Sequence, residues 1–242
     1  MRIVWAITKK EFKSYFSSPI AYVFLVVFLI LTNWLFFNNY FVAKMATMRD
    51  FFSLIPWIFL FFIPAVTMRL WAEEKKLGTQ EILMTLPIKD YEAVFGKYLA
   101  AFLFLMVAII LTLPLTLIVR GTVDPKVGID VGPIIGGYLG TLLIGAAYLA
   151  IGVFASSLTE NQIIGFILGI AISFFLFIIG ENFVLFRLPD LLVPIFRYIA
   201  LGVHFDSIAR GVIDSKDVIY YLSVILFFLF LNIRSVESRK WK

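Results

Sequence analysis

The chain contains no cysteine and a single histidine, His204, among its 242 residues. The missing cysteines exclude a disulfide framework and a thiolate metal site, and one histidine excludes a histidine-rich metal centre. Charged residues are also scarce, at 15% of the chain. The sequence patterns of a nucleotide-binding phosphate loop, a zinc protease and a serine hydrolase are all missing. We therefore expect no catalytic site, metal or cofactor in this chain.

Hydrophobic residues, in contrast, make up 62% of the chain, well above the share in soluble proteins. They gather in runs of about the length that a bilayer core requires. Because backbone groups within lipid must find partners inside the chain, runs of this length are expected to be helices. We predict one all-α membrane domain over residues 1–242, with six transmembrane helices at residues 20–41, 51–70, 98–119, 134–155, 163–179 and 218–233.

The first 18 residues are too polar to cross a membrane. They predict an amphipathic helix that lies in the membrane interface, with aromatic and basic residues on different sides. Ile7 falls outside the aromatic arc, so the amphipathic pattern is imperfect. Pro19 then marks the turn into the first span. The residues assigned to the interfacial helix are Trp5, Lys9, Phe12, Lys13 and Phe16.

The longest polar passage, residues 70–97, separates the second and third predicted spans. Gly78 interrupts the arriving helix, because glycine disfavours a helix interior. Thr79 can cap a new short helix with Glu81 in its first turn, and Pro87 stops that helix. The pattern is therefore helix, break, short helix, break, helix. Spacing alone slightly favours a solvated connecting loop over an element that docks a partner.

Lysine and arginine gather in the amino-terminal segment, in residues 70–97 and in the carboxy-terminal tail. By the positive-inside rule, both termini and residues 70–97 are expected in the cytoplasm, and the bias also favours contact with anionic lipid over nucleic acid. Residues 181–217 then lie on the other side. Their apolar residues recur at helical spacing and predict a re-entrant or interfacial helical hairpin. These residues are Leu191, Leu192, Ile195, Phe196 and Ile199.

Glycines recur every four residues in the fourth and fifth predicted spans. Such spacing lets membrane helices approach closely, and we expect it to serve packing within the bundle. The residues are Gly132, Gly136, Gly140, Gly165 and Gly169.

Residues 73–100, EEKKLGTQEILMTLPIKDYEAVFGKYLA, resemble the coupling region of ABC-2-type exporter permeases. The pattern in that family is E-x-K/R-x-G-T-x-E-x-L-x-T-L-P. The carboxy-terminal run HFDSIARGVIDSKDVIYYLSVILFFLFLNIRSVESRKW is similar to the gliding-motility-associated permeases of bacteria. Coupling to a partner ATPase is assigned to Glu74, Gly78, Thr79, Glu81, Leu83, Leu86 and Pro87.

The resemblance implies a permease subunit of the bacterial inner membrane with an unknown substrate. It implies a cytoplasmic coupling helix and a dimer, formed with a second copy or a paralogue. It also implies a cytoplasmic ABC ATPase dimer, which would hold ATP and Mg²⁺, and in many relatives an auxiliary membrane protein. A membrane anchor or mechanical adaptor on the same ATPase is an alternative. A stand-alone channel or carrier is disfavoured, because the cores of the predicted spans lack the ionisable residues that such proteins use.

Overall fold

The computed structural model describes residues 2–43, 47–85, 87–122 and 130–238. Within these ranges the protein is all-helical, as predicted. Five segments are long and apolar enough to cross a membrane: Pro19–Asn38, Arg49–Lys76, Asp90–Thr122, Val131–Ser157 and Ser215–Glu237. The remaining predicted span is α9 (Gln162–Ile178), an apolar helix of 17 residues. Its length of about 25 Å is shorter than a hydrocarbon core of roughly 30 Å, so the six-span arrangement stays a prediction.

The helix α8 (Val131–Ser157) lies at the centre and is the most deeply buried of the membrane-length segments. It packs against α3 (Arg49–Thr67), α9, α12 (Leu201–Ala209) and α13 (Ser215–Glu237). The predicted glycine packing is confirmed within the chain. A Cβ atom added to Gly136 would lie 2.2 Å from the carbonyl oxygen of Ile208 in α12, and one added to Gly169 in α9 would lie 3.1 Å from Pro64 in α3.

Two predicted spans extend beyond their predicted bounds and contain breaks. The second continues through a break at Met68 into α4 (Arg69–Lys76). The third begins earlier, as α6 (Asp90–Ile110), because the acidic residues of its first turn start the helix well outside the apolar run. It then breaks and resumes as α7 (Leu113–Thr122), with Pro114 at the second position, where its missing N–H group costs nothing.

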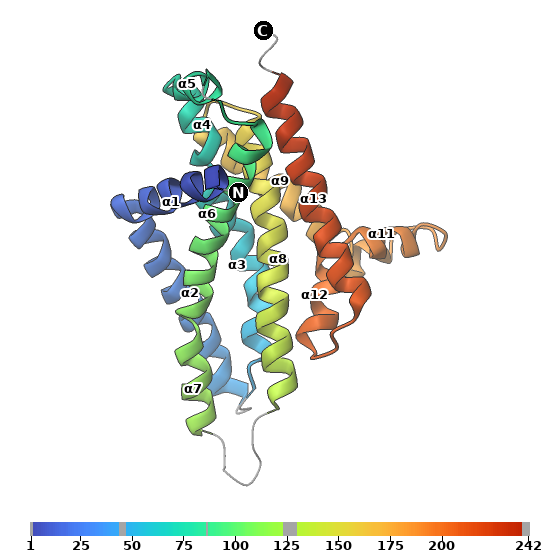
Figure 1. Cartoon of the computed structure of the whole chain (residues 1–242). Helices are drawn as coiled ribbons and strands as arrows, with labels where there is room; N and C mark the ends of the chain where they lie inside the picture. Colours follow the sequence, from blue (N-terminus) through green and yellow to red (C-terminus); the bar gives the residue numbers. More distant parts are fainter. Residues whose placement is uncertain (1, 44–46, 86, 123–129, 239–242) are drawn as a thin grey trace.

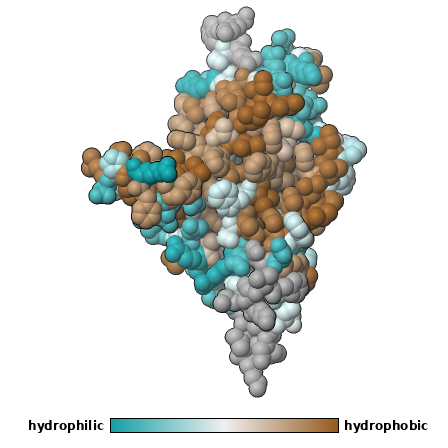
Figure 2. Space-filling view, turned by 180° about the vertical axis from the view of Figure 1, so that it is seen from behind, coloured by the Kyte–Doolittle hydropathy of each residue, from teal (hydrophilic) through white to brown (hydrophobic). Residues whose placement is uncertain are grey.

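The helix α1 (Arg2–Ser17) crosses one end of the molecule at a steep angle to the long helices, and α2 (Pro19–Ala43) begins at Pro19 as predicted (Figure 1). The same end carries α4, α5 (Thr79–Thr85) and the end of α13, so we call it the α5 end. The opposite end, which carries α7, we call the α7 end. Figure 2 shows hydrophobic side chains over the middle of one face and hydrophilic side chains towards both ends, as a bilayer requires.

The predicted hairpin is helical but is divided into α10 (Asn182–Leu185), α11 (Val193–Ile199) and α12. The five apolar residues at helical spacing do not share one helix, because Leu191 and Leu192 lie in a turn before α11. None of the residues of α11 is buried in the protein, and the helix points away from the bundle (Figure 1). The element that packs is α12, which buries Phe205 and Ile208 against α8.

Candidate docking surface

The α4–α5 corner projects at the α5 end (Figure 1). The chain turns there at Gly78, whose φ of +69° lies in the left-handed region that glycine adopts without strain. The neighbouring Leu77 is 66% exposed, a large apolar side chain in an otherwise polar passage. A single exposed leucine is common on protein surfaces, so Leu77 is a candidate anchor and does not by itself mark an interface. The corner therefore offers a candidate anchor that sequence reasoning had not assigned.

The structure places the predicted coupling residues around this corner. Glu81 lies exposed in the first turn of α5, as predicted. The hydroxyl of Thr79, predicted to cap α5, donates back across the break to the carbonyl oxygen of Glu74 at 3.4 Å. Leu83 lies in α5, and Pro87 lies exposed after it. Leu86 lies outside the described residues.

The start of α4 is fixed to the end of α8 by one hydroxyl. The first N–H groups of a helix have no partner within the helix. In α4 the N–H groups of Trp71 and Ala72 donate to Oγ of Ser156, at 3.1 and 3.2 Å. The same hydroxyl donates to the carbonyl oxygen of Met68 at 2.7 Å. Ser156 therefore joins the two sides of the break between α3 and α4 to the central helix.

A second connection joins α4 to Ser157, the last residue of α8. The ammonium group of Lys75 in α4 donates to the carbonyl oxygen of Ser157. That carbonyl also accepts a hydrogen bond of 3.2 Å from the hydroxyl of Ser235 in α13. Three helices thus meet at one peptide group, so a displacement of α4 would also shift or break contacts of α8 and α13.

The third connection is a buried ion cluster around Lys97 of α6. Its side chain is 1% exposed, and its Nζ atom lies 2.7 Å from Glu74 of α4 and 3.2 Å from Glu11 of α1. The ammonium group also lies 4.9 Å from the centre of the Trp71 ring, at cation–π distance. Of the predicted coupling residues, Glu74 belongs to this cluster. Sequence reasoning missed Glu11 and Lys97, because their pairing depends on the approach of three separate helices.

The packing of α1 on α6 uses a residue outside the predicted aromatic arc. Ile7 is buried in the protein, whereas Trp5 of that arc is 62% exposed. The reason lies in α6, where Gly96 leaves room for the Ile7 side chain: an added Cβ atom would lie 2.7 Å from its Cγ2 atom. The hydroxyl of Thr8 donates to the carbonyl oxygen of Gly96 at 3.2 Å.

The other residues assigned to the interfacial helix differ in exposure. Phe12 and Phe16 are partly buried against the core, whereas Lys9 and Lys13 are exposed. Further along the helix, Tyr15 is buried and its hydroxyl donates to the carbonyl oxygen of Val66 at 3.1 Å, which joins α1 to α3. Burial raises the pKa of Tyr15 well above its usual value, although the neighbouring Arg69 opposes the shift.

The fold and this surface together define a multi-pass membrane protein with a structured polar corner at one end of its helix bundle. The family described as ABC-2 family transporter protein matches residues 35–233, which include α3 to α12 and most of α13. The chain belongs to this family. It is therefore the kind of protein that forms the membrane component of an ABC transporter. No curated protein matches the chain.

Proposed function

We propose that this protein is the permease subunit of an ATP-driven ABC exporter, and that the α4–α5 corner docks on a separate ABC ATPase. Family membership supports the role of membrane component. The observation that carries the docking surface is the combination of an exposed corner at Leu77 and Gly78 with an α4 that is tied to its neighbours. A force from the partner on this corner would therefore be transmitted to the helices that contact α4, which a flexible loop could not do.

The route of the push follows from the three connections of α4. The hydrogen bonds of Ser156 and of the Ser157 carbonyl join α4 to α8 and α13. The ion pairs of Lys97 join α4 to α6 and α1. The helix α5 has 7 residues, too few to be stable alone, so its shape depends on these neighbours. ATP binding and hydrolysis in the partner would then rearrange the membrane helices together. ATP and Mg²⁺ belong to the partner in this proposal.

We further propose that the α5 end faces the cytoplasm of a bacterium, with both termini on that side of the inner membrane. The basic residues of α1 and of the α4–α5 passage support this orientation. Exposed apolar residues along α2, α9 and α13 are available to lipid or to a second permease, a copy or a paralogue. The substrate is left unassigned.

Co-purification with the partner ATPase tests the docking surface. Leu83→Asp and Leu77→Asp each place a charge on the proposed contact, and loss of a central anchor typically costs about 2 kcal/mol, more than tenfold in affinity. We expect ATPase recovery to fall by that factor while membrane insertion is unchanged. Leu158→Asp is the matched control, at a leucine that is 43% exposed in the link after α8. Equal recovery from all three variants would place docking elsewhere, with α1 as the next candidate.

A mechanical role is the second candidate, and the likeness of the carboxy-terminal run to gliding-motility permeases favours it. In this case the same corner would bind the ATPase, and the bundle would anchor an auxiliary membrane protein instead of moving a substrate. The two proposals share the docking experiment and differ in transport. ATP-dependent accumulation of a substrate in inverted vesicles would support the exporter. Pull-down of an auxiliary membrane protein with no transport would support the anchor.

A further inference from the structure

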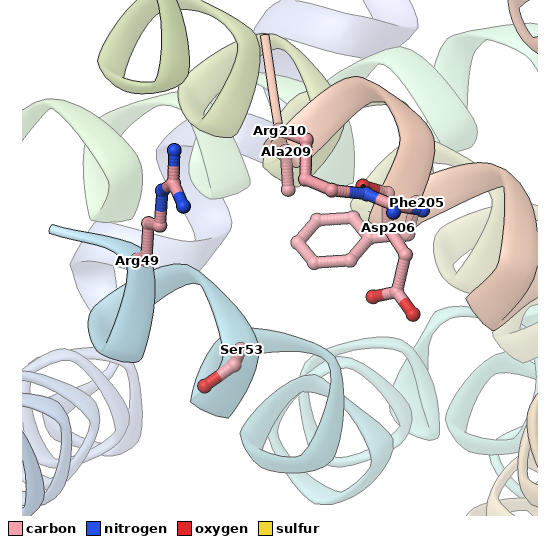
Figure 3. Close-up of a pocket in the computed structure, with 6 residues that line it drawn as sticks. All are labelled: Arg49, Ser53, Phe205, Asp206, Ala209 and Arg210. Carbon is pink, nitrogen blue, oxygen red and sulfur yellow. Dashed lines mark hydrogen bonds between the residues drawn. The ribbon is translucent and has the colours of Figure 1, made fainter. Parts of the chain in front are cut away.

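A cavity of about 350 Å³ lies between α3 and α12, at the α7 end of the protein. Figure 3 shows Arg49 and Ser53 of α3 on one wall and α12 with its following residue on the other. The residues that line it are Arg49, Ser53, Phe205, Asp206, Ala209 and Arg210. This cavity is remote from the proposed docking surface, and the two have no residue in common.

The charges around the cavity favour an anion. The lining includes two guanidinium groups and one carboxylate, so it carries a net charge of +1 from Arg49, Arg210 and Asp206. Arg210 donates through Nε to the backbone carbonyl oxygen of Asp206 at 3.0 Å, which leaves its terminal nitrogens for another acceptor. Within the described ranges, neither arginine forms an ion pair with a carboxylate.

The wall that carries Arg210 is held in place by close backbone contacts. The next residue, Gly211, has a φ of +89°, and a Cβ atom there would lie 3.0 Å from the backbone of Gly132 in α8. The floor is the ring of Phe205, which is 1% exposed. The position of the Arg210 backbone is therefore set by the central helix, whereas its side chain is exposed.

The depth of the cavity fits the level of lipid headgroups. Arg49 is the first residue of the membrane-length segment Arg49–Lys76, and the start of such a segment is expected near the polar boundary of the bilayer. Guanidinium groups bind phosphate oxygens in a bidentate manner, which makes arginine the preferred residue for phosphate recognition. The hydroxyl of Ser53, one helical turn from Arg49, also lines the cavity, but it donates its proton to the carbonyl oxygen of Asp50 at 2.8 Å.

We propose that this cavity binds a phosphate group through the guanidinium groups of Arg49 and Arg210. A phospholipid headgroup of the leaflet at the α7 end is one source of that group, and a soluble phosphate ester is the other. Binding at this position would fix α12, and with it the hairpin, to the start of α3.

Titration of the delipidated protein in detergent tests the proposal. The probes are phosphatidylglycerol and diacylglycerol, which differ by the phosphoglycerol headgroup, with glycerol phosphate as a soluble competitor. We expect phosphatidylglycerol to bind, diacylglycerol not to bind, and the double variant Arg49→Gln/Arg210→Gln to bind phosphatidylglycerol at least tenfold more weakly. Displacement of the lipid by glycerol phosphate would assign the site to a soluble ester, and no displacement would assign it to lipid.

The matched control is Arg187→Gln/Arg197→Gln, which removes two exposed arginines of the same hairpin that do not line the cavity. We expect this control to bind phosphatidylglycerol like the unmodified protein. Equal binding by the two double variants, or equal binding of the two lipids, would overturn the proposal. Arg49→Gln alone changes one exposed side chain, so it serves if the double variant fails to fold. It is expected to show part of the same loss.

Discussion

Replacement of Lys97 by methionine removes the cation that two helices share. The substitution keeps the length and apolar stem of the side chain, so the change is mainly one of charge. After the exchange Glu11 still lies 3.6 Å from the exposed Lys10. Glu74 loses its 2.7 Å contact, and its second oxygen, Oε2, is buried and has no hydrogen-bond partner among the described residues. The variant therefore leaves the Glu74 carboxylate without the cation that compensates its charge.

The expected cost follows from burial. The side chains of Lys97 and Glu74 are 1% and 16% exposed, so water screens the pair only weakly. Removal of one partner from a buried ion pair typically costs about 3–5 kcal/mol. For a chain of this size each kcal/mol corresponds to roughly 2–4 °C in Tm, which predicts a decrease of roughly 6–20 °C. The double variant Lys97→Met/Glu74→Gln removes the orphan charge as well, and is expected to recover at least half of that loss.

Thermal unfolding in detergent, followed by size-exclusion fluorescence, measures these differences. Lys76→Met is the control, because Lys76 is exposed on the same helix as Glu74 and its loss is expected to change the free energy of unfolding by less than about 0.5 kcal/mol. A Tm for Lys97→Met within the range of this control would refute the reasoning. Failure of Glu74→Gln to restore stability would show that the ammonium group acts mainly through Trp71.

Gly96→Val is expected to overpack the contact between α1 and α6 and to destabilise the protein by about 1–3 kcal/mol, measured by thermal unfolding. Adding Ile7→Ala is expected to restore part of this stability, because it removes the side chain that the valine would meet. If it restores none, Ile7 is not the obstacle. Burial raises the pKa of Asp206, although Arg210 opposes the shift, so the folded state holds this proton more strongly than the unfolded state. The resulting stability is fully present below the ordinary carboxyl pKa of about 4 and is lost as the pH rises through the raised value. Asp206→Asn is expected to weaken the dependence of Tm on pH in this range. An unchanged dependence would contradict the assignment to Asp206.

The breaks in the chain could be predicted because they depend on local chemistry. Pro19 begins α2 and Gly78 takes a positive φ between α4 and α5, as the restrictions on these two residue types require. The glycine stripe of α8 was also readable, since close helix approach needs a missing side chain at regular spacing. The helix that packs against these glycines, α12, could not be predicted, because the spacing of glycines does not identify the helix that approaches them.

The ion cluster and the register of α1 could not be predicted from the sequence. Lys97 and Glu11 are separated by 86 positions, and nothing in either segment indicates the other. The amphipathic pattern of α1 describes that helix in isolation. The burial of Ile7 depends instead on the space at Gly96 in another helix. The hairpin shows a similar limit: an apolar face at helical spacing fits lipid contact and protein packing equally well, and only the fold separates α11 from α12.

A photoreactive residue at the α4–α5 corner tests the central claim most directly. Introduced in place of Leu77 or Thr79, which are both exposed, it would be irradiated in membranes that contain the partner ATPase. The docking proposal predicts a crosslinked species with the combined mass of the two proteins, and none from the same probe in place of Tyr198 on α11. Crosslinking to the ATPase from Tyr198, with none from Leu77 or Thr79, would contradict both the docking surface and the proposed orientation.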